Sequence, residues 1–288
     1  MPAILVTGST GTVGAQVVAE LLARGKKVNA AVRSGRVGRF DSTVSEVVFD
    51  FEDPSTFEGA LAGVSGVFLM RPPQMSDSKV MRPFIDAMTL HGVEHVAFLS
   101  VQGAGSNPFV PHHGIEQYVM RSGLSWTFLR PSFFMQNLST THAADIRERD
   151  EVFVPAGRGK TNFIDASDVA RAAAVVLTMP GHLGKAYELT GSEALTYAEV
   201  AQVLSEVCGR EITYPSPSAR EFKSRMKASG CDAEFVSVMG SIYLIAKLGM
   251  AAGTTTELQR LIGRPPTTLR EWVQLNAECF MSSSEQMG

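Results

Sequence analysis

Short apolar runs alternate with amphipathic segments through the first half of the chain. The apolar runs cover residues 3–7, 27–32, 46–49, 66–70, 95–100 and 125–129. The segments between them place apolar residues three and four positions apart, as amphipathic helices do, over 12–24, 54–62, 76–91 and 112–122. Short strands that are apolar on both faces and alternate with helices indicate a parallel sheet covered on both sides. The pattern predicts an α/β protein with a Rossmann-type doubly wound parallel sheet.

The pattern changes after Pro131. Residues 132–150 are expected to form a helix, 151–165 a hairpin-like pair of strands, and 166–179 a helix that returns to the first domain. A strand over 185–191, a helix over 196–208 and a mostly helical remainder follow. We therefore expect a nucleotide-binding Rossmann domain of residues 1–131 and 162–180. A smaller, interleaved C-terminal domain of residues 132–161 and 181–288 is expected to bind the substrate.

The composition and charge of the chain argue against several classes of protein. The chain has 288 residues, of which 44% are hydrophobic, and a net charge of −3. That charge argues against a nucleic-acid or membrane-surface partner. The three cysteines, Cys208, Cys231 and Cys279, are widely spaced, so neither a disulfide framework nor a metal site is expected. Because the first apolar run begins at residue 3, we expect no signal peptide and a cytoplasmic protein.

The sequence "TGSTGTVG" follows the first apolar run and opens the first predicted helix. Its glycines are three residues apart, unlike the G-x-G-x-x-G of the best-known dinucleotide fingerprint. Glycine lets the backbone approach a phosphate, and a helix N-terminus offers unpaired N–H groups to an anion. A tight turn without a ligand is the alternative. The strand and helix on either side favour a phosphate site made by Gly8, Thr10, Gly11, Thr12, Val13 and Gly14.

The end of the second predicted strand indicates which dinucleotide binds. A site that prefers NAD places an acid there, about 20 residues past the glycine loop, to bind the ribose 2′-hydroxyl. Here the strand ends at Arg33, with Arg36 following, and a guanidinium favours the 2′-phosphate of NADP. A solvated basic loop is the alternative interpretation. Asp50 and Phe51, after the third strand, suit the adenine, although Asp50 is also a candidate helix cap.

Ligands of doubly wound sheets bind outside the carboxyl ends of the strands. The residues that follow the later strands are therefore expected to contact the cofactor. These are Met70, Arg71, Pro72, Ser100 and Pro131.

These landmarks together resemble the NmrA-like branch of the atypical short-chain dehydrogenase/reductases. The matching pieces include "VTGSTGTVG", "VVFDFEDPSTFEGAL", "HVAFLSVQGA", "HHGIEQYVMRSGLSWTFLRPSFFMQNL" and "GRPPTTLREWV", and they span residues 3 to about 275 in order. The branch includes triphenylmethane reductases, NAD(P)H:quinone oxidoreductases and non-catalytic regulators that sense NADP. The resemblance implies the Rossmann fold and an NADP site.

The chain departs from the family at the Tyr-x-x-x-Lys dyad, in which the lysine tunes the tyrosine to act as an acid. Its one Y-x-x-x-K, Tyr243–Lys247, has the spacing of ordinary helix packing. In the family's register, Glu116 and Ser100 match the helix glutamate and the strand-end serine, while Pro108 takes the tyrosine position and His112 the lysine position. We take Ser100 and His112 as the candidate catalytic residues; a partly exposed helix-cap role is the alternative for His112.

The substrate pocket is expected to favour a flat, aromatic and weakly polar ligand. Pro131 redirects the chain after the sixth strand and places Phe133 near the nicotinamide end of the cofactor. The other candidate substrate contacts are Gln102, Phe109, Phe134, Asn137 and Tyr243. Core packing between the domains is the alternative for Phe134 and Tyr243.

Two functions follow from these features. The first is an NADPH-dependent reductase that transfers hydride to a quinone, a dye or a similar conjugated small molecule. The second is a non-catalytic redox sensor that binds NADP(H) and acts through a protein partner, which the missing dyad favours. We favour the reductase, with NADPH as cofactor and a homodimer as one expected state.

Overall fold

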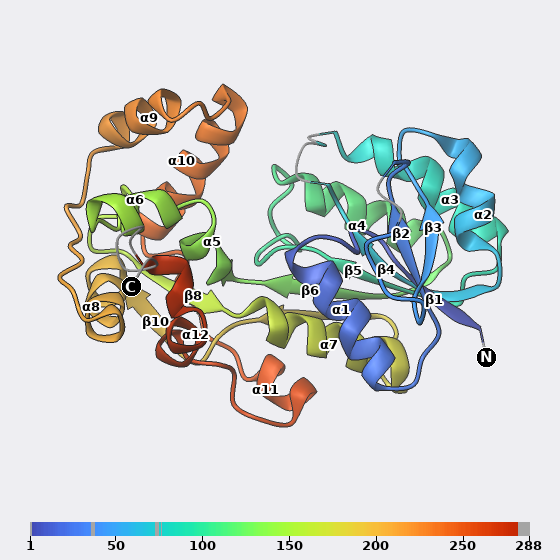
Figure 1. Cartoon of the computed structure of the whole chain (residues 1–288). Helices are drawn as coiled ribbons and strands as arrows, with labels where there is room; N and C mark the ends of the chain where they lie inside the picture. The colour runs from blue at the N-terminus through green and yellow to red at the C-terminus, as the bar shows by residue number, and fades with distance from the viewer. Residues whose placement is uncertain (1, 36–37, 73–74, 76, 282–288) are drawn as a thin grey trace. The chain divides into compact units, whose positions relative to one another are not determined.

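The computed structural model describes residues 2–35, 38–72, 75 and 77–281 (Figure 1). The chain divides into two compact units. Unit 1 consists of residues 1–131, 166–189 and 257–264, and unit 2 of residues 132–165, 190–256 and 265–288. The chain therefore leaves unit 1 after Pro131 and returns to it twice.

Unit 1 is built on a seven-stranded sheet in which every neighbouring pair of strands is parallel. The strands are β1 (Ala3–Val6), β2 (Val28–Val32), β3 (Ser45–Val48), β4 (Val64–Met70), β5 (His95–Leu99), β6 (Ser125–Pro131) and β9 (Lys185–Leu189). Their order across the sheet is β3-β2-β1-β4-β5-β6-β9, so the winding reverses between β1 and β4. The predicted doubly wound Rossmann sheet is confirmed.

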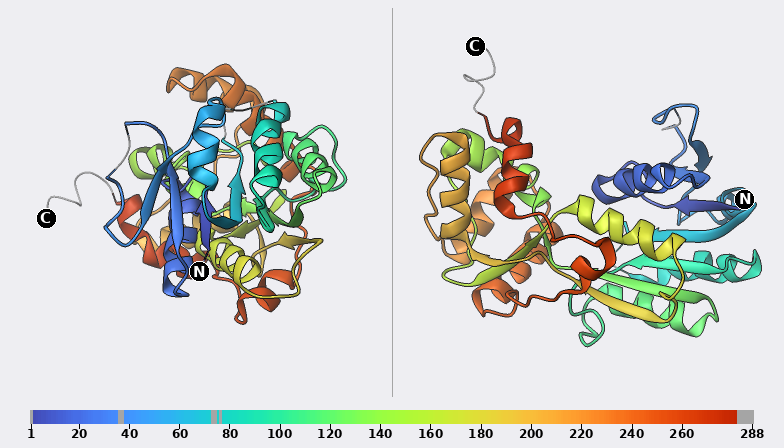
Figure 2. Two further views of the ribbon diagram at one scale, coloured as in Figure 1. Left: turned by 90° about the vertical axis from the view of Figure 1, so that its right-hand side faces the viewer. Right: turned by 90° about the horizontal axis from the view of Figure 1, so that it is seen from below.

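Helices cover both faces of this sheet (Figure 2). The helices of unit 1 are α1 (Thr12–Ala23), α2 (Phe57–Leu61), α3 (Arg82–Leu90), α4 (Pro111–Arg121), α7 (Ala166–Thr178) and α11 (Glu257–Ile262), with 3₁₀ turns at Pro54–Thr56 and Ser78–Met81. The helices α2, α3 and α4 pack with β3–β6 in one continuous apolar core. Phe49, Phe57 and Phe84 meet in this core in tilted and edge-to-face arrangements, with ring centroids 4.6–5.8 Å apart. The helices α1 and α7 pack against each other.

Unit 2 has a three-stranded sheet in the order β10-β8-β7. Its elements are β7 (Phe133–Phe134), α5 (Gln136–Ser139), α6 (Ala143–Arg149), β8 (Lys160–Ile164), β10 (Ala194–Thr196), α8 (Tyr197–Cys208), α9 (Ala219–Ala228), α10 (Ala233–Lys247), α12 (Leu269–Leu275) and a 3₁₀ turn at Ala277–Phe280. Three of the helices, α8, α9 and α12, start with capping boxes, which satisfy the free N–H groups of the first turn. Aromatic side chains from β7, β8, α8, α9 and α10 meet in its core.

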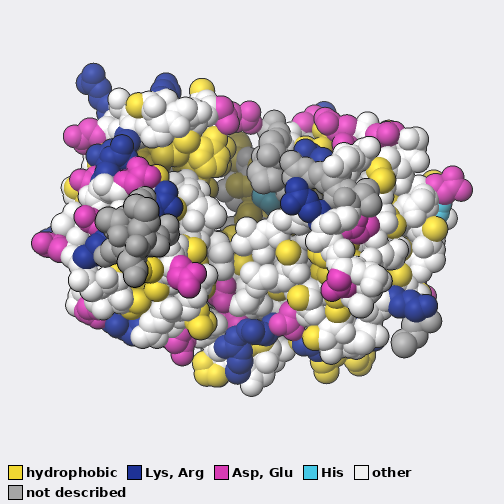
Figure 3. Space-filling model, in the orientation of Figure 1, with side chains coloured by type: hydrophobic (Ala, Val, Ile, Leu, Met, Phe, Trp, Pro, Cys, Tyr) yellow, Lys and Arg dark blue, Asp and Glu magenta, His cyan; other side chains and the backbone are white. Residues whose placement is uncertain are grey.

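Part of the surface of α10 and of the turn after it is apolar. Val238, Leu244, Leu248 and Met250 are each more than half exposed. Figure 3 shows hydrophobic side chains gathered in this region. None of the described helices is long and apolar enough to cross a membrane.

The predicted helix over 132–150 is wrong, because Phe133 and Phe134 form β7 and the helical part breaks at Thr140, which leaves helical dihedral angles (φ −121°, ψ −80°). The predicted hairpin over 151–165 is also wrong. Its second half is β8, whose partners are β7 and β10.

The two units differ from the division expected from the sequence at three places. Residues 162–165 belong to unit 2, and 181–189 and 257–264 belong to unit 1. Strand β9 joins the large sheet by pairing with β6, and α11 packs against α7 and β9.

Candidate functional site

The glycine loop after β1 is held by two buried hydroxyl groups. The Thr7 hydroxyl donates to the Phe68 carbonyl at 3.1 Å and accepts from the Met70 N–H at 2.8 Å. The Ser9 hydroxyl donates to the Ala31 carbonyl at 2.7 Å. The loop is therefore fixed to both neighbours of β1, which are β4 and β2.

Each of the three glycines of the loop has a different structural environment. Gly8 has a left-handed backbone (φ +61°), and a Cβ there would lie 2.0 Å from the Met70 methyl carbon. At Gly14 a Cβ would lie 2.1 Å from the Gly8 carbonyl oxygen. These two glycines therefore allow the loop to pack against Met70 of β4 and against α1. At Gly11 a Cβ would lie 3.2 Å from the Gly8 carbonyl oxygen, which is closer than an ordinary van der Waals contact but does not exclude a side chain.

Gly11 is also the N-cap of α1. Among the described residues no side chain caps this helix, and its first turn carries no acidic residue. The first N–H groups of an α-helix lack helical partners and attract anions together with the helix dipole. Thr12, Val13 and Gly14 form this turn, which lies where the sequence predicted a phosphate site.

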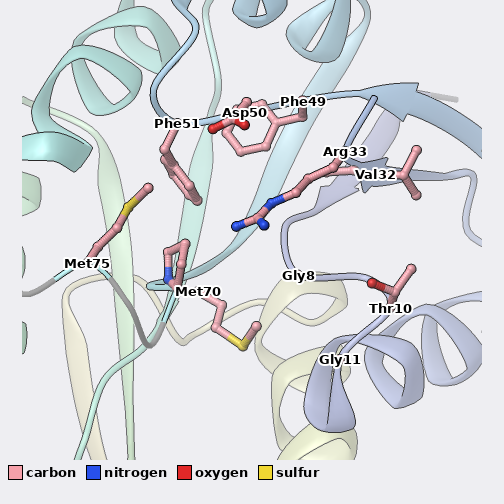
Figure 4. Close-up of a pocket in the computed structure, with 12 residues that line it drawn as sticks. Gly8, Thr10, Gly11, Val32, Arg33, Phe49, Asp50, Phe51, Met70 and Met75 are labelled. Atoms are coloured by element: carbon pink, nitrogen blue, oxygen red, sulfur yellow. The ribbon is translucent and has the colours of Figure 1, made fainter. Parts of the chain in front are cut away.

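A pocket opens beside this helix end, at the carboxyl ends of β1 to β4 (Figure 4). Predicted cofactor contacts supply eight of its lining residues: Gly8, Thr10, Gly11, Arg33, Asp50, Phe51, Met70 and Pro72. Sequence reasoning missed the other four, Ala31, Val32, Phe49 and Met75. The first three lie within two residues of predicted contacts at strand ends, which is a signal that could have found them.

Arg33 directly follows β2, is exposed, and extends into the pocket (Figure 4). The chain after it is held by Glu46 of β3, whose carboxylate accepts from the N–H groups of Gly38, Arg39 and Phe40 at 2.5, 2.7 and 2.8 Å. The hydrogen bond from Gly38 is the main cause that lowers the pKa of Glu46. The predicted contact Arg36 lies outside the described residues.

Asp50 and Phe51 form the far wall of the pocket. The cap of the following 3₁₀ turn is Asp53, which accepts from the Ser55 N–H at 3.0 Å, so Asp50 does not serve as that cap. Phe51 is 6% exposed and meets the Phe49 ring edge-on at 4.7 Å. The Asp50 carboxylate accepts from the Glu52 N–H at 3.0 Å, so contacts within the protein restrain both side chains.

Met70, Arg71 and Pro72 follow β4. The Met70 methyl group packs on Gly8, as described above, and forms part of the pocket floor. The Arg71 guanidinium donates to the carbonyls of Pro72 (3.2 Å) and Met75. Arg71 thus contacts the backbone of two residues that line the pocket but is not itself one of the lining residues.

Ser100 directly follows β5, and His112 is the second residue of α4. The buried Ser100 hydroxyl donates to a Glu116 carboxylate oxygen at 2.6 Å. Burial, and then the nearby charge of Arg71, lower the pKa of His112 to about 4, and its ring lies 6.0 Å from that of Phe98. His112 is therefore a neutral imidazole near pH 7. The neighbouring His113 ring pairs with the Ala104 carbonyl at 2.8 Å.

The structure does not bring the predicted substrate contacts into the pocket. In unit 1, the Gln102 N–H donates to the Pro131 carbonyl at 2.9 Å, and Phe109 is 92% exposed. In unit 2, Phe133, Phe134 and Asn137 are half-buried on β7 and α5.

Tyr243 belongs to the core of unit 2. It has no exposed surface, and its hydroxyl pairs with Nε2 of the equally buried His142. Burial raises the pKa of Tyr243 and lowers that of His142 to about 4. Tyr243 is therefore a poor proton donor that no substrate reaches in this structure. Among the described residues no three His, Cys, Asp or Glu side chains form a metal site.

The chain is similar to several characterised reductases. It is 35% identical to the NAD(P)H azoreductase of Xenophilus azovorans in an alignment of 285 positions that covers 96% of this chain and 99% of that protein. It is 29% identical to the Citrobacter sp. triphenylmethane reductase solved with NADP(H), with a TM-score of 0.86 over 95% of this chain and 99% of that one.

A second solved structure gives the same result. The NADPH-dependent quinone oxidoreductase of Escherichia coli, in complex with NADPH, is 28% identical with a TM-score of 0.87 and covers 95% of this chain and 99% of that one. The model of the NmrA-like family matches residues 2–273. The predicted relationship is thus confirmed: the chain belongs to the NmrA-like family.

Proposed function

We propose that this protein is an NADPH-dependent reductase of quinones, dyes and similar conjugated small molecules. The observation that carries the proposal is the pocket of unit 1, where an uncapped helix N-terminus and Arg33 line one cavity. The relatives named above reduce acceptors of this kind with the same class of cofactor.

The pocket fits the adenosine end of NADP. The helix N-terminus at Gly11–Gly14 would hold the diphosphate, because its N–H groups need acceptors. Arg33 would hold the 2′-phosphate, and the preformed wall of Asp50 and Phe51 would hold the adenine. No carboxylate follows β2 directly, where one would repel that phosphate. When bound, the cofactor supplies hydride, which the protein itself has no group to provide.

The polar groups near the strand ends favour acceptors that need no strong acid. His112 is neutral near pH 7, and the Ser100 hydroxyl proton is committed to Glu116. Quinones and cationic dyes take hydride without first being protonated, whereas simple ketones need an acid. We propose Gln102, Phe109, Phe133, Phe134 and Asn137 as acceptor contacts, and His112 as a neutral hydrogen-bond donor.

The direct test follows NADPH absorbance against a panel of quinones, triphenylmethane dyes and enals. We expect turnover on quinones or dyes, and none with Gly11→Val, whose bulky side chain would stand in the phosphate site. Gly59→Ala is the matched control, since a Cβ at Gly59 meets nothing within 4 Å. Turnover absent from the whole panel, with NADP-dependent binding to a protein partner, would establish the sensor instead.

We further propose that the two units are the nucleotide-binding and substrate-binding domains, and that the protein works in the cytoplasm. A reducing compartment suits the free thiols of Cys208, Cys231 and Cys279. A homodimer stays a prediction, which sedimentation velocity tests.

A further inference from the structure

A partly buried ionic network lies at the carboxyl ends of β5, β6 and β9, on the opposite side of the switch point from β2 and β3. Glu116 of α4 is 1% exposed and accepts from Nε and one terminal nitrogen of Arg130 at 2.9 and 2.7 Å. The other terminal nitrogen of Arg130 donates to Glu188 of β9 at 3.2 Å. We refer to Glu116, Arg130 and Glu188 as the ionic array.

The ionic array holds the loop of residues 101–106, which follows β5. The second oxygen of Glu188 accepts from the Gly103 N–H at 3.3 Å. The backbone of Gly105 crosses so close to Arg130 that a Cβ there would lie 2.6 Å from the guanidinium nitrogens. His113 and Pro131 fix two further backbone atoms of this loop, as described above. These hydrogen bonds restrain the loop at Gln102, Gly103 and Ala104.

The cost of the array indicates that it does more than stabilise the fold. Removing two charges from water is expensive, and replacing a buried ion pair by apolar residues of similar volume is often neutral or stabilising. A bidentate Arg–carboxylate pair gains positional precision instead. That precision is applied to a loop at the edge of the sheet where ligands bind.

The topology identifies which half of the cofactor this loop faces. The pocket that fits adenosine lies at β1 to β4, and a dinucleotide in such a fold lies across the switch point. Strands in a sheet are about 4.8 Å apart, so β6 lies roughly three spacings, about 14 Å, from β1. The second half of the dinucleotide therefore reaches β5 and β6.

We infer that Glu116, Arg130 and Glu188 are positioning residues that hold the 101–106 loop in place for the nicotinamide half of NADP(H). The inference rests on the proposed function. Ser100 belongs to the same arrangement: with its proton donated to Glu116, its oxygen offers acceptor sites only.

Two variants disturb the array in different ways. Glu116→Leu with Arg130→Met removes the ion pair, while Gly105→Ala keeps every charge and forces the loop away from Arg130. The controls are Arg82→Met with Asp86→Leu, which removes an exposed ion pair of α3, and Gly59→Ala. Two probes separate the halves of the cofactor: NADPH, and 2′,5′-ADP, which carries the adenosine half alone.

Both array variants should lower kcat for a quinone roughly 10- to 100-fold, the scale of a small misplacement of a reacting group. They should weaken NADPH binding while 2′,5′-ADP binds as in the unaltered protein, and the controls should change neither. A matched loss of 2′,5′-ADP affinity would show a general structural defect and overturn the inference, as would an unchanged kcat in Gly105→Ala. If the unaltered protein bound neither probe, the proposed function itself would fail.

Discussion

Glu116 of unit 1 and His142 of unit 2 are both buried, but in opposite ways. In unit 1, Glu116 is buried as a charged carboxylate, with a guanidinium fork on it and a loop of the ligand-binding edge attached. In unit 2, His142 is buried as a neutral imidazole against Tyr243, and its Nδ1 has no hydrogen-bond partner among the described residues. Removing the charge of Glu116 from water costs free energy, and the ion pair it makes holds a loop in position. The neutral His142 side chain instead contributes to the packing of the core.

This contrast predicts different effects for substitutions in the two units. Changes at the carboxyl edge of unit 1 should alter ligand binding and leave stability nearly unchanged. Changes in unit 2 should alter stability and leave the binding of 2′,5′-ADP unchanged. Each unit carries one tryptophan, Trp126 in unit 1 and Trp272 in unit 2. The Trp126→Phe background therefore lets fluorescence report unit 2 alone.

The largest effect is expected from acid on unit 2. The pKa of His142 is about 4 in the folded protein and 6.5 in the unfolded chain, so between these values only the unfolded chain binds the proton. The free energy of unfolding should therefore fall as the pH drops from 6.5 to 4, by about 3 kcal/mol from this residue. Urea unfolding of the Trp126→Phe protein at pH 7.0, 5.5 and 4.5 measures this loss.

His142→Gln should be less stable at pH 7, since Tyr243 loses its imidazole partner, but its stability should depend less on pH. His91→Gln, at an exposed site of unit 1, is the control and should keep the full dependence. An unchanged slope in His142→Gln would mean that the acid sensitivity of unit 2 has another source.

Next in size is Arg33→Ala. Loss of a charged hydrogen bond to the 2′-phosphate should weaken NADPH binding by about 1.5–3 kcal/mol, roughly ten- to 150-fold, and leave NADH binding nearly unchanged. Calorimetric titration with both cofactors measures the difference, with Arg24→Ala at the end of α1 as the control. Equal affinities for the two cofactors, unaffected by Arg33→Ala, would refute the preference for NADP.

The smallest effect is expected at the start of α8. Thr196 caps this helix by accepting from the Glu199 N–H at 3.2 Å, so Thr196→Ala should lower the free energy of unfolding by about 1 kcal/mol. Thr254→Ala, at an exposed loop position, serves as the comparison and should change little. If Thr196→Ala altered 2′,5′-ADP affinity as well, the separation between the two units would not hold.

The parts that sequence predicted well are those with local signals. The parallel strands show as short apolar runs, and the glycine loop, Arg33 and Asp50 all lie within a few residues of a strand end. Eight predicted residues consequently meet in one pocket. Met75 was missed because it lies in a loop with no regular pattern.

The ionic array could not be predicted as a unit. Its members come from α4, β6 and β9, up to 72 residues apart in the chain. Only the three-dimensional structure shows that the Ser100 hydroxyl donates to Glu116 and that His112 is neutral near pH 7. Strand β7 escaped prediction for a related reason: helix propensity predicts residues 132–150 as one helix, whereas Phe133 and Phe134 pair with β8, which lies about 30 residues further along the chain.

Strand β9 lies far along the chain from its partner β6, and this affects folding during synthesis. Strand β6 ends at Pro131, but its outer partner is Lys185–Leu189, and α11, which covers β9, is Glu257–Ile262. A nascent chain emerging N-terminus first therefore exposes the edge of β6 while about fifty further residues are synthesised. An unpaired strand edge invites pairing with other chains. Fragments that stop at Pro131 should accordingly aggregate, and the shortest fragment in which β6 has its outer partner must extend past Leu189.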